Sequence, residues 1–139
     1  MLYIIICVTF HDMDNPRAWI TDAEAPRERS WRIAELVAQA ADGERFRRVC
    51  GSTDALRTAV LRLPAGDEVV QHRHERSDEV FVIVSGTATF HVDGRSFDVV
   101  PGDVIFAKGG ERHGIQVGPT DPLDMLLVVA PNLDDAEPH

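Results

Sequence analysis

The chain has 139 residues, of which 44% are hydrophobic and 27% are charged, a composition typical of one soluble globular domain. Its formal net charge of −9 argues against binding to nucleic acid or to an anionic membrane, because both partners require a basic surface. The two cysteines form no C-x-x-C pair, which argues against a disulfide framework or a thiolate zinc site and leads us to expect a reducing, cytoplasmic location.

The first ten residues, MLYIIICVTF, form a short apolar stretch. They are fewer than the ~20 residues needed to cross a bilayer, and they lack the basic region and cleavage site of a signal peptide. We therefore expect an additional β-strand here. Met13 is a second possible start, so residues 1–12 belong to the natural protein only if translation begins at Met1.

A charged, proline-containing loop is predicted for residues 12–29, and one helix follows it. Ser30 is expected to cap that helix and Gly43 to end it. Apolar residues recur at helical spacing over residues 30–41 and are expected to pack on the rest of the domain: Ile33, Leu36, Val37 and Ala40.

From residue 45 onward, short alternating segments are separated by turn residues such as Asp93-Gly94. About eight strands at regular intervals predict an all-β sandwich or barrel over residues 56–131. Residues 1–55 are then an N-terminal extension whose strand, loop and helix pack on the barrel. Residues 132–139 are predicted to be an acidic, frayed tail.

Two histidines lie one residue apart in the predicted strand EVVQHRH. Alternate side chains of a strand point to the same face, so His72 and His74 share a face, with Cα atoms about 6.6 Å apart. The same alternation predicts Val70 on that face. Two imidazoles placed in this way are suited to bind one metal ion.

Glu79 follows in the next predicted strand, where it shares a face with Phe81 and Ile83. This position suggests a carboxylate near the core, where a lone charge is costly and a cation would remove the cost. The alternative is a surface ion pair with Arg73 or Arg112.

The opposite face of that strand carries Val80, Val82 and Val84. An apolar face of this kind needs a cover, and in a small barrel the cover is often a second subunit. We therefore expect a homodimer.

His113 follows the glycine-rich turn KGGE and begins another predicted strand. Imidazole nitrogen and carboxylate oxygen both bind first-row divalent metals at about 2.0–2.2 Å, so His113 is a candidate to join the first three residues. His91 is out of phase with its apolar neighbours Phe90 and Val92 and is expected to be solvated.

The spacing from Gly66 to Gly86, G-x5-H-x-H-x4-E-x6-G, resembles the first motif of the cupin superfamily. The segment GDVIFAKGGERH, residues 102–113, is similar to the second motif. Lys108 stands where the family usually has proline, and Val117 where it often has asparagine. Neither position is a metal ligand in the family, so these departures concern loop rigidity and the pocket lining.

The resemblance covers roughly residues 56–130 and implies a cupin jelly-roll β-barrel, commonly dimeric, with a short N-terminal helix outside the match. It implies one divalent metal ion (Fe, Mn, Ni, Co or Zn) inside the barrel. The ligands it implies are His72, His74, Glu79 and His113. A degenerate barrel without metal is the alternative.

Three function classes remain open. The first is a metal-dependent enzyme acting on a small oxygenated organic molecule, with a dioxygenase-type reaction preferred and an isomerase or decarboxylase second. No general base is evident, and Lys108 is the nearest candidate. Six residues are candidates for lining the substrate pocket: Arg57, Phe81, Phe90, Phe106, Gln116 and Met125.

The second class is a non-enzymatic binding or sensing module, in which the metal only anchors a small-molecule ligand. The cupin fold hosts many functions and does not by itself separate these classes. The third is a scaffold that works through its valine face and N-terminal strand.

Overall fold

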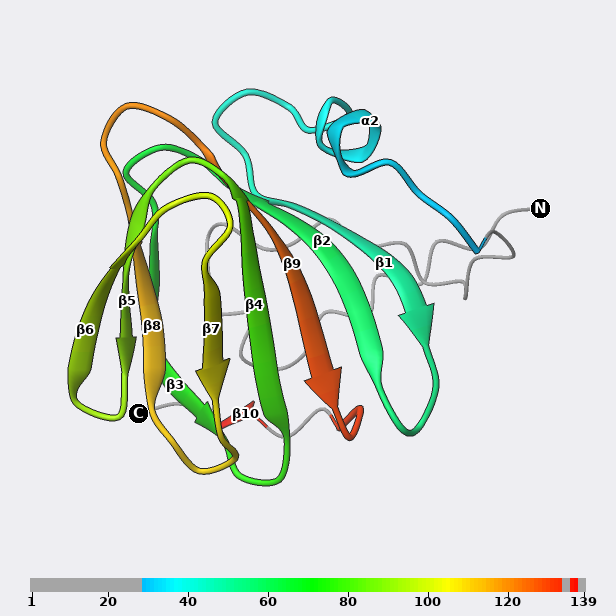
Figure 1. Cartoon of the computed structure of the whole chain (residues 1–139), viewed down its shortest axis with the longest axis vertical. Helices are drawn as coiled ribbons and strands as arrows, with labels where there is room; N and C mark the ends of the chain where they lie inside the picture. The colour runs from blue at the N-terminus through cyan, green and yellow to red at the C-terminus, as the bar shows by residue number, and fades with distance from the viewer. Residues whose placement is uncertain (1–28, 134–135, 138–139) are drawn as a thin grey trace.

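The computed structural model describes residues 29–133 and 136–137, which form two five-stranded sheets that face each other with one short helix outside (Figure 1). The first sheet has the order β1 (Phe46–Ser52), β2 (Arg57–Leu63), β9 (Leu123–Ala130), β4 (Asp78–Ser85), β7 (Val104–Ala107). The second has the order β10 (Ala136–Glu137), β3 (Glu68–His74), β8 (His113–Val117), β5 (Ala88–Val92), β6 (Arg95–Val99). Neighbouring strands in both sheets are antiparallel.

The prediction of an all-β jelly roll is confirmed. The two sheets form an open sandwich and do not close into a continuous barrel. Each segment that alternates in the sequence after residue 45 forms a strand, and β1 extends the first sheet beyond the start of the predicted barrel at residue 56. The predicted strand in residues 1–10 and most of the predicted loop lie outside the described residues.

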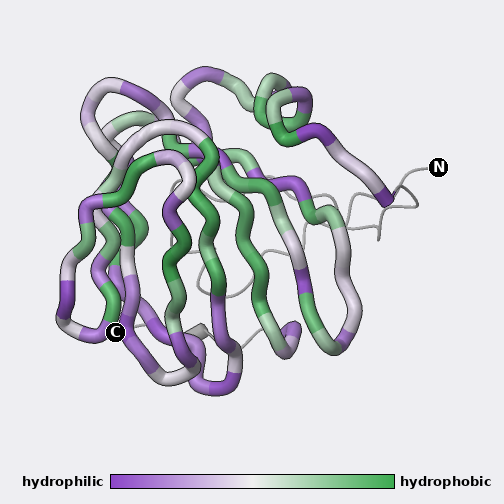
Figure 2. Tube along the Cα trace, in the orientation of Figure 1, coloured by the Kyte–Doolittle hydropathy of each residue, from purple (hydrophilic) through white to green (hydrophobic). Residues whose placement is uncertain are grey.

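The core fills the space between the sheets. Hydrophobic residues are concentrated along the central strands (Figure 2). Inward positions alternate along each strand, as the period of a strand requires. Five of the largest core side chains are at most 1% exposed: Leu63, Ile83, Phe90, Leu123 and Met125. These residues belong to one apolar cluster, which joins both sheets and contains no polar residue.

The helix α2 (Ile33–Val37) is shorter than the predicted span of residues 30–41. It begins after Arg32, without a side-chain cap, so the expectation for Ser30 is wrong. The next backbone N–H groups bond three residues back instead of four, which tightens the last turn and ends the helix before Gly43.

The helix packs on the outer face of the first sheet. Leu36 and Val37 form a second apolar cluster with Cys50 and Val60. The segment after the helix is fixed by a buried ion pair, in which Arg45 Nε lies 2.7 Å from Asp67 Oδ2. The predicted role of the helix as packing, not binding, agrees with these contacts.

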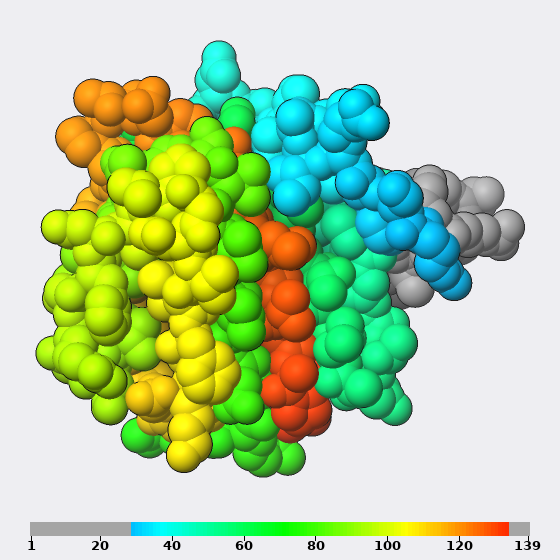
Figure 3. All heavy atoms as spheres, viewed as in Figure 1, coloured from blue at the N-terminus to red at the C-terminus, as the bar shows by residue number. Residues whose placement is uncertain are grey.

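Part of the outer face lies beyond the helix (Figure 3). We call Val80, Val82, Val84, Val104 and Phe106 the outer valine face. The first two residues lie directly across from Phe106 and Val104 on β7, and the last three are between 38% and 63% exposed. The helix covers β1 and β2, whereas β4 and β7 remain uncovered by any described residue in this view.

Two residues of the predicted acidic tail form a short strand. Ala136 pairs with His74 and Glu137 with Arg73, which adds β10 to the edge of the second sheet. No helix among the described residues is long and apolar enough to cross a membrane.

Candidate metal centre

The four predicted ligand residues meet at one end of the sandwich, where β3 and β9 end and β4 and β8 begin (Figure 1). His72 and His74 come from the end of β3, and His113 is the first residue of β8. All three belong to the second sheet. Glu79 reaches them from β4 of the first sheet, so the site lies between the two sheets.

A β-bulge turns the histidines of β3 inward. Val69 pairs with Ile115 and packs on the core, but the next pair is His72 with His113, which leaves one extra residue on β3. Val70, which we predicted on the histidine face, is 57% exposed. That prediction is wrong because strict alternation breaks at the bulge, a feature known to re-aim side chains beside functional sites.

Gly114 makes room for this bulge, and sequence reasoning missed it. A Cβ at this position would lie 2.8 Å from the carbonyl oxygen of Val69 and 2.9 Å from Cγ of Gln71. The signal was present, since a glycine inside a strand often marks a bulge or a close backbone approach. Gly114 is therefore a positioning residue for His72.

The ligand atoms are close enough to share one ion. The three imidazoles each offer a nitrogen, and these atoms lie within 4.8 Å of one another. Glu79 Oε1 lies 3.2 Å from His74 Nε2, and Glu79 Oε2 lies 2.7 Å from His113 Nε2. Adjacent ligands that are each about 2.1 Å from a metal lie about 3 Å apart, which matches these separations.

Hydrogen bonds fix the ring orientations. His72 Nδ1 lies 2.9 Å from the carbonyl oxygen of Val70, and His113 Nδ1 lies 3.1 Å from that of Glu111. A carbonyl only accepts, so each Nδ1 carries a proton, and each ring in its neutral form presents a lone pair at Nε2. The buried Nε2 of His113 has no hydrogen-bond partner of acceptable geometry among the described residues, as expected of an atom oriented to bind a metal.

Burial and the neighbouring charges set the ionisation of the site. Burial, aided by the nearby His113, lowers the pKa of His72 to about 4. Burial alone would raise the pKa of Glu79, but the three imidazoles, His113 above all, hold it below its ordinary value. Burial likewise opposes charge on His113, but the Glu79 carboxylate raises the pKa of that imidazole above its ordinary value. The carboxylate therefore stays ionised, ready to neutralise a cation.

Aromatic rings form the wall of the site toward the core. Phe81 is the next inward residue after Glu79, and its ring centroid lies 6.1 Å from that of His113. Phe90 packs edge-on against Phe81 at 5.2 Å and is fully buried. Met125 lies deeper, in the core row of Ile83, and therefore serves packing more than lining.

The other three candidate lining residues do not all lie on the inner faces of the sheets. Phe106 is 55% exposed on the outer valine face, because it pairs with Val80 and not with an inward residue. Gln116 is also exposed, out of phase with the buried Ile115. The structure does not support a lining role for either. Arg57, by contrast, lies on the inner face.

The alternative partners of these residues are also accounted for. Arg73 pairs with Glu75 at 2.6 Å, and Glu79 contacts the imidazoles. His91 contacts Ser96 Oγ at 2.8 Å on the outer side. Lys108 is exposed in the turn between β7 and β8.

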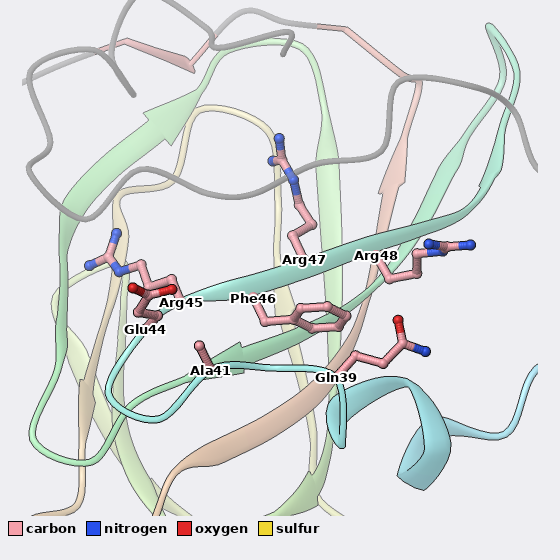
Figure 4. Close-up of a pocket in the computed structure, with 7 residues that line it drawn as sticks. All are labelled: Gln39, Ala41, Glu44, Arg45, Phe46, Arg47 and Arg48. Atoms are coloured by element: carbon pink, nitrogen blue, oxygen red, sulfur yellow. The ribbon is translucent and has the colours of Figure 1, made fainter. Parts of the chain in front are cut away.

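A hollow of about 250 Å³ lies beside β1, separate from the four ligand residues (Figure 4). Its wall comes from β1 and the segment after α2: Gln39, Ala41, Glu44, Arg45, Phe46, Arg47 and Arg48. The three arginines already have partners within the protein, so this hollow adds nothing to the candidate metal centre.

Comparisons with known proteins give one family match. The model of the Cupin domain matches residues 59–129, which contain all four candidate ligands. A curated relative, the "Oxalate-binding protein" of Thermotoga maritima, is 39% identical over 72 residues, which are 51% of this chain and 59% of that protein. The chain spans less than two thirds of the length of the curated relatives it matches.

Solved structures agree on the fold. A Klebsiella pneumoniae protein with a double-stranded β-helix domain gives a TM-score of 0.69 at 27% identity, covering 79% of this chain and 96% of that one. A Thermotoga maritima protein named a "predicted oxalate decarboxylase" gives 0.53 at 34% identity, covering 55% and 67%.

The bulge yields a first prediction. Gly114→Ala should weaken metal binding about 10- to 100-fold, the range observed when groups that orient metal ligands are altered, although Gly114 is not a ligand. The added Cβ cannot coexist with the bulge, so His72 should lose its inward position. Titration of the purified variant with Zn²⁺, followed by calorimetry, measures this.

Gly51→Ala is the matched control, because a Cβ there meets only Thr58 Oγ1, at 3.4 Å in ordinary contact. Equal zinc affinity for both variants and the wild type would show that the bulge does not position His72.

Proposed function

The chain belongs to the cupin family, and from this premise we propose that it binds one divalent metal through His72, His74, Glu79 and His113 and acts on a small oxygenated organic molecule. The observation that carries the proposal is the buried Glu79 carboxylate, which lies within 3.2 Å of imidazole nitrogens from the opposite sheet. Without a bound cation, the buried charge of Glu79 would have to be balanced by a proton on an imidazole such as His113.

The donor set suits Fe, Mn, Ni, Co or Zn and selects only weakly among them. Four such ligands would leave two positions of an octahedron open. When bound, the metal would supply Lewis-acid polarisation of an oxygen donor and, as iron, chemistry with O2. The chain's own contribution is to orient the imidazoles of His72 and His113 through their Nδ1 hydrogen bonds and to exclude water through Phe81 and Phe90.

A dioxygenase-type or isomerase-type reaction is the preferred function, and a binding or sensing module is the second candidate. The names of the relatives favour an oxygen-rich small ligand in both cases. A curated Thermotoga maritima relative is named for binding oxalate, which supports the binding module. A solved structure from the same organism is named a predicted oxalate decarboxylase, which supports an enzyme. The scarcity of a nearby general base also favours the binding module.

Removing one ligand tests the metal centre. We expect His74→Ala to lower the affinity for a divalent metal by at least about 100-fold. Altering a group that only hydrogen-bonds to a metal ligand already lowers the affinity about 10- to 100-fold. His91→Ala, which removes an outward imidazole, should keep about one ion per chain. Elemental analysis of protein purified without a metal-affinity step measures both. Equal metal content in the two variants would refute the assignment.

Turnover separates the two candidate functions. The iron-loaded protein, supplied with diols, thiols and enolic acids, should consume O2 if it is a dioxygenase-type enzyme. His74→Ala under the same conditions is the blank. If none of these compounds gives product but one of them raises the melting temperature of the protein, the binding module is favoured.

We also propose a homodimer that covers the outer valine face. The five apolar side chains are contiguous across β4 and β7, and β7 is an edge strand. Phe106→Ser should therefore convert the dimer to a monomer, as measured by light scattering after size exclusion. Phe97→Ser, at another exposed phenylalanine on β6, is the control. A wild-type protein that is monomeric at micromolar concentration would contradict the proposal.

A further inference from the structure

Arg57 lies in the same row of the first sheet as Glu79. It pairs with Val129 on β9, and Val129 pairs in turn with Glu79 on β4. Val129 is buried in the core between the sheets, so this row faces inward. Adjacent strands are about 4.8 Å apart, which puts the Cα atoms of Arg57 and Glu79 about 10 Å from each other.

Two other arginines with largely buried side chains are paired with carboxylates. Arg45 is paired with Asp67, and Arg62 on the outer side of β2 is paired with Asp124 at 2.6 Å. The Arg57 side chain makes no hydrogen bond or ion pair with any residue that the structure describes. A half-buried guanidinium without a counter-ion is costly, and a bound anion would remove that cost.

The backbone before Arg57 is held firmly at this end of the sandwich. Asn132 donates from Nδ2 to Ser52 Oγ at 3.0 Å and to the carbonyl of Thr53 at 2.9 Å. Ser77, just before β4, donates to the carbonyl of the residue that precedes Asn132. These bonds connect the turn before β2, the end of β9 and the start of β4, so Arg57 and Glu79 keep a fixed relation.

We infer that Arg57 binds a carboxylate of the ligand, and that the site takes small organic acids whose other end carries oxygen donors for the metal. This inference rests on the proposed metal centre. A guanidinium presents a planar pair of donors that matches a carboxylate, which gives orientation as well as affinity. Two-point binding of this kind would place an acid between the metal and β2.

The charges at the site favour the binding of an organic acid, whereas the net charge of the whole protein opposes it. The formal net charge of −9 repels anions from the surface as a whole. Within the site, a divalent cation held by one carboxylate keeps a net positive charge, and Arg57 adds another. An acid therefore gains charge-assisted contacts at the end of the sandwich that carries the candidate ligands and Arg57.

The test uses the full chain loaded with Zn²⁺, which is redox-inert, and calorimetric titration with malonate, malate and succinate. Arg57→Gln should weaken the best of these acids about 10- to 100-fold, the factor that corresponds to one charge-assisted hydrogen-bonded contact. Arg57→Lys should recover part of the affinity. Malonamide, the neutral counterpart of malonate, should bind no better to the wild type than to Arg57→Gln.

Arg95→Gln is the matched control, since it removes the same charge from an exposed position on β6. Elemental analysis accompanies each titration, so loss of zinc is distinguished from loss of the acid contact. Equal affinity of the acids for wild type and Arg57→Gln, at full zinc occupancy, would overturn the inference. A zinc-loaded wild type that binds none of the acids would also overturn it while leaving the metal centre intact. A wild type that holds no metal would instead defeat the proposed function.

Discussion

A carboxylate buried between two sheets is the constraint around which one end of this protein is organised. Glu79 lies on the inner face of the first sheet, where water cannot solvate it, and three imidazoles approach it from the second. A charge in that position must be compensated by something positive. The strand ends that supply the three imidazoles, and the Nδ1 hydrogen bonds that orient the rings of His72 and His113, fit a divalent cation in that position.

The local irregularity of β3 follows from this constraint. A regular strand that kept Val69 in the core would turn His72 toward solvent, and the bulge corrects the phase at the cost of ladder hydrogen bonds. The bulge in turn requires a neighbour without a side chain, which Gly114 provides. Packing and ligand placement are thus reconciled within a few residues of two adjacent strands.

Sequence reasoning reached the fold class, the strand positions and the convergence of four side chains, because alternation and motif spacing are local properties. It failed where the outcome depended on long-range register. Phe106 and Gln116 have the composition of pocket residues, but pairing with neighbouring strands turns both outward. The helix end at Val37 depended on a tightened turn that its apolar spacing does not encode. The alternation of side chains along a strand was enough to name Arg57 as a candidate lining residue. That it lies in line with Glu79 across the sheet became clear only from the pairing of β2, β9 and β4.

The separation of the apolar cluster from the ligand end has a consequence for how the ion is acquired. The cluster joins both sheets without the imidazoles, so folding on the ribosome need not wait for metal. A site that is complete before it is filled, with ligands of broad preference, would take its ion by competition among the available metals. The metals available where the protein resides would then decide which element it carries.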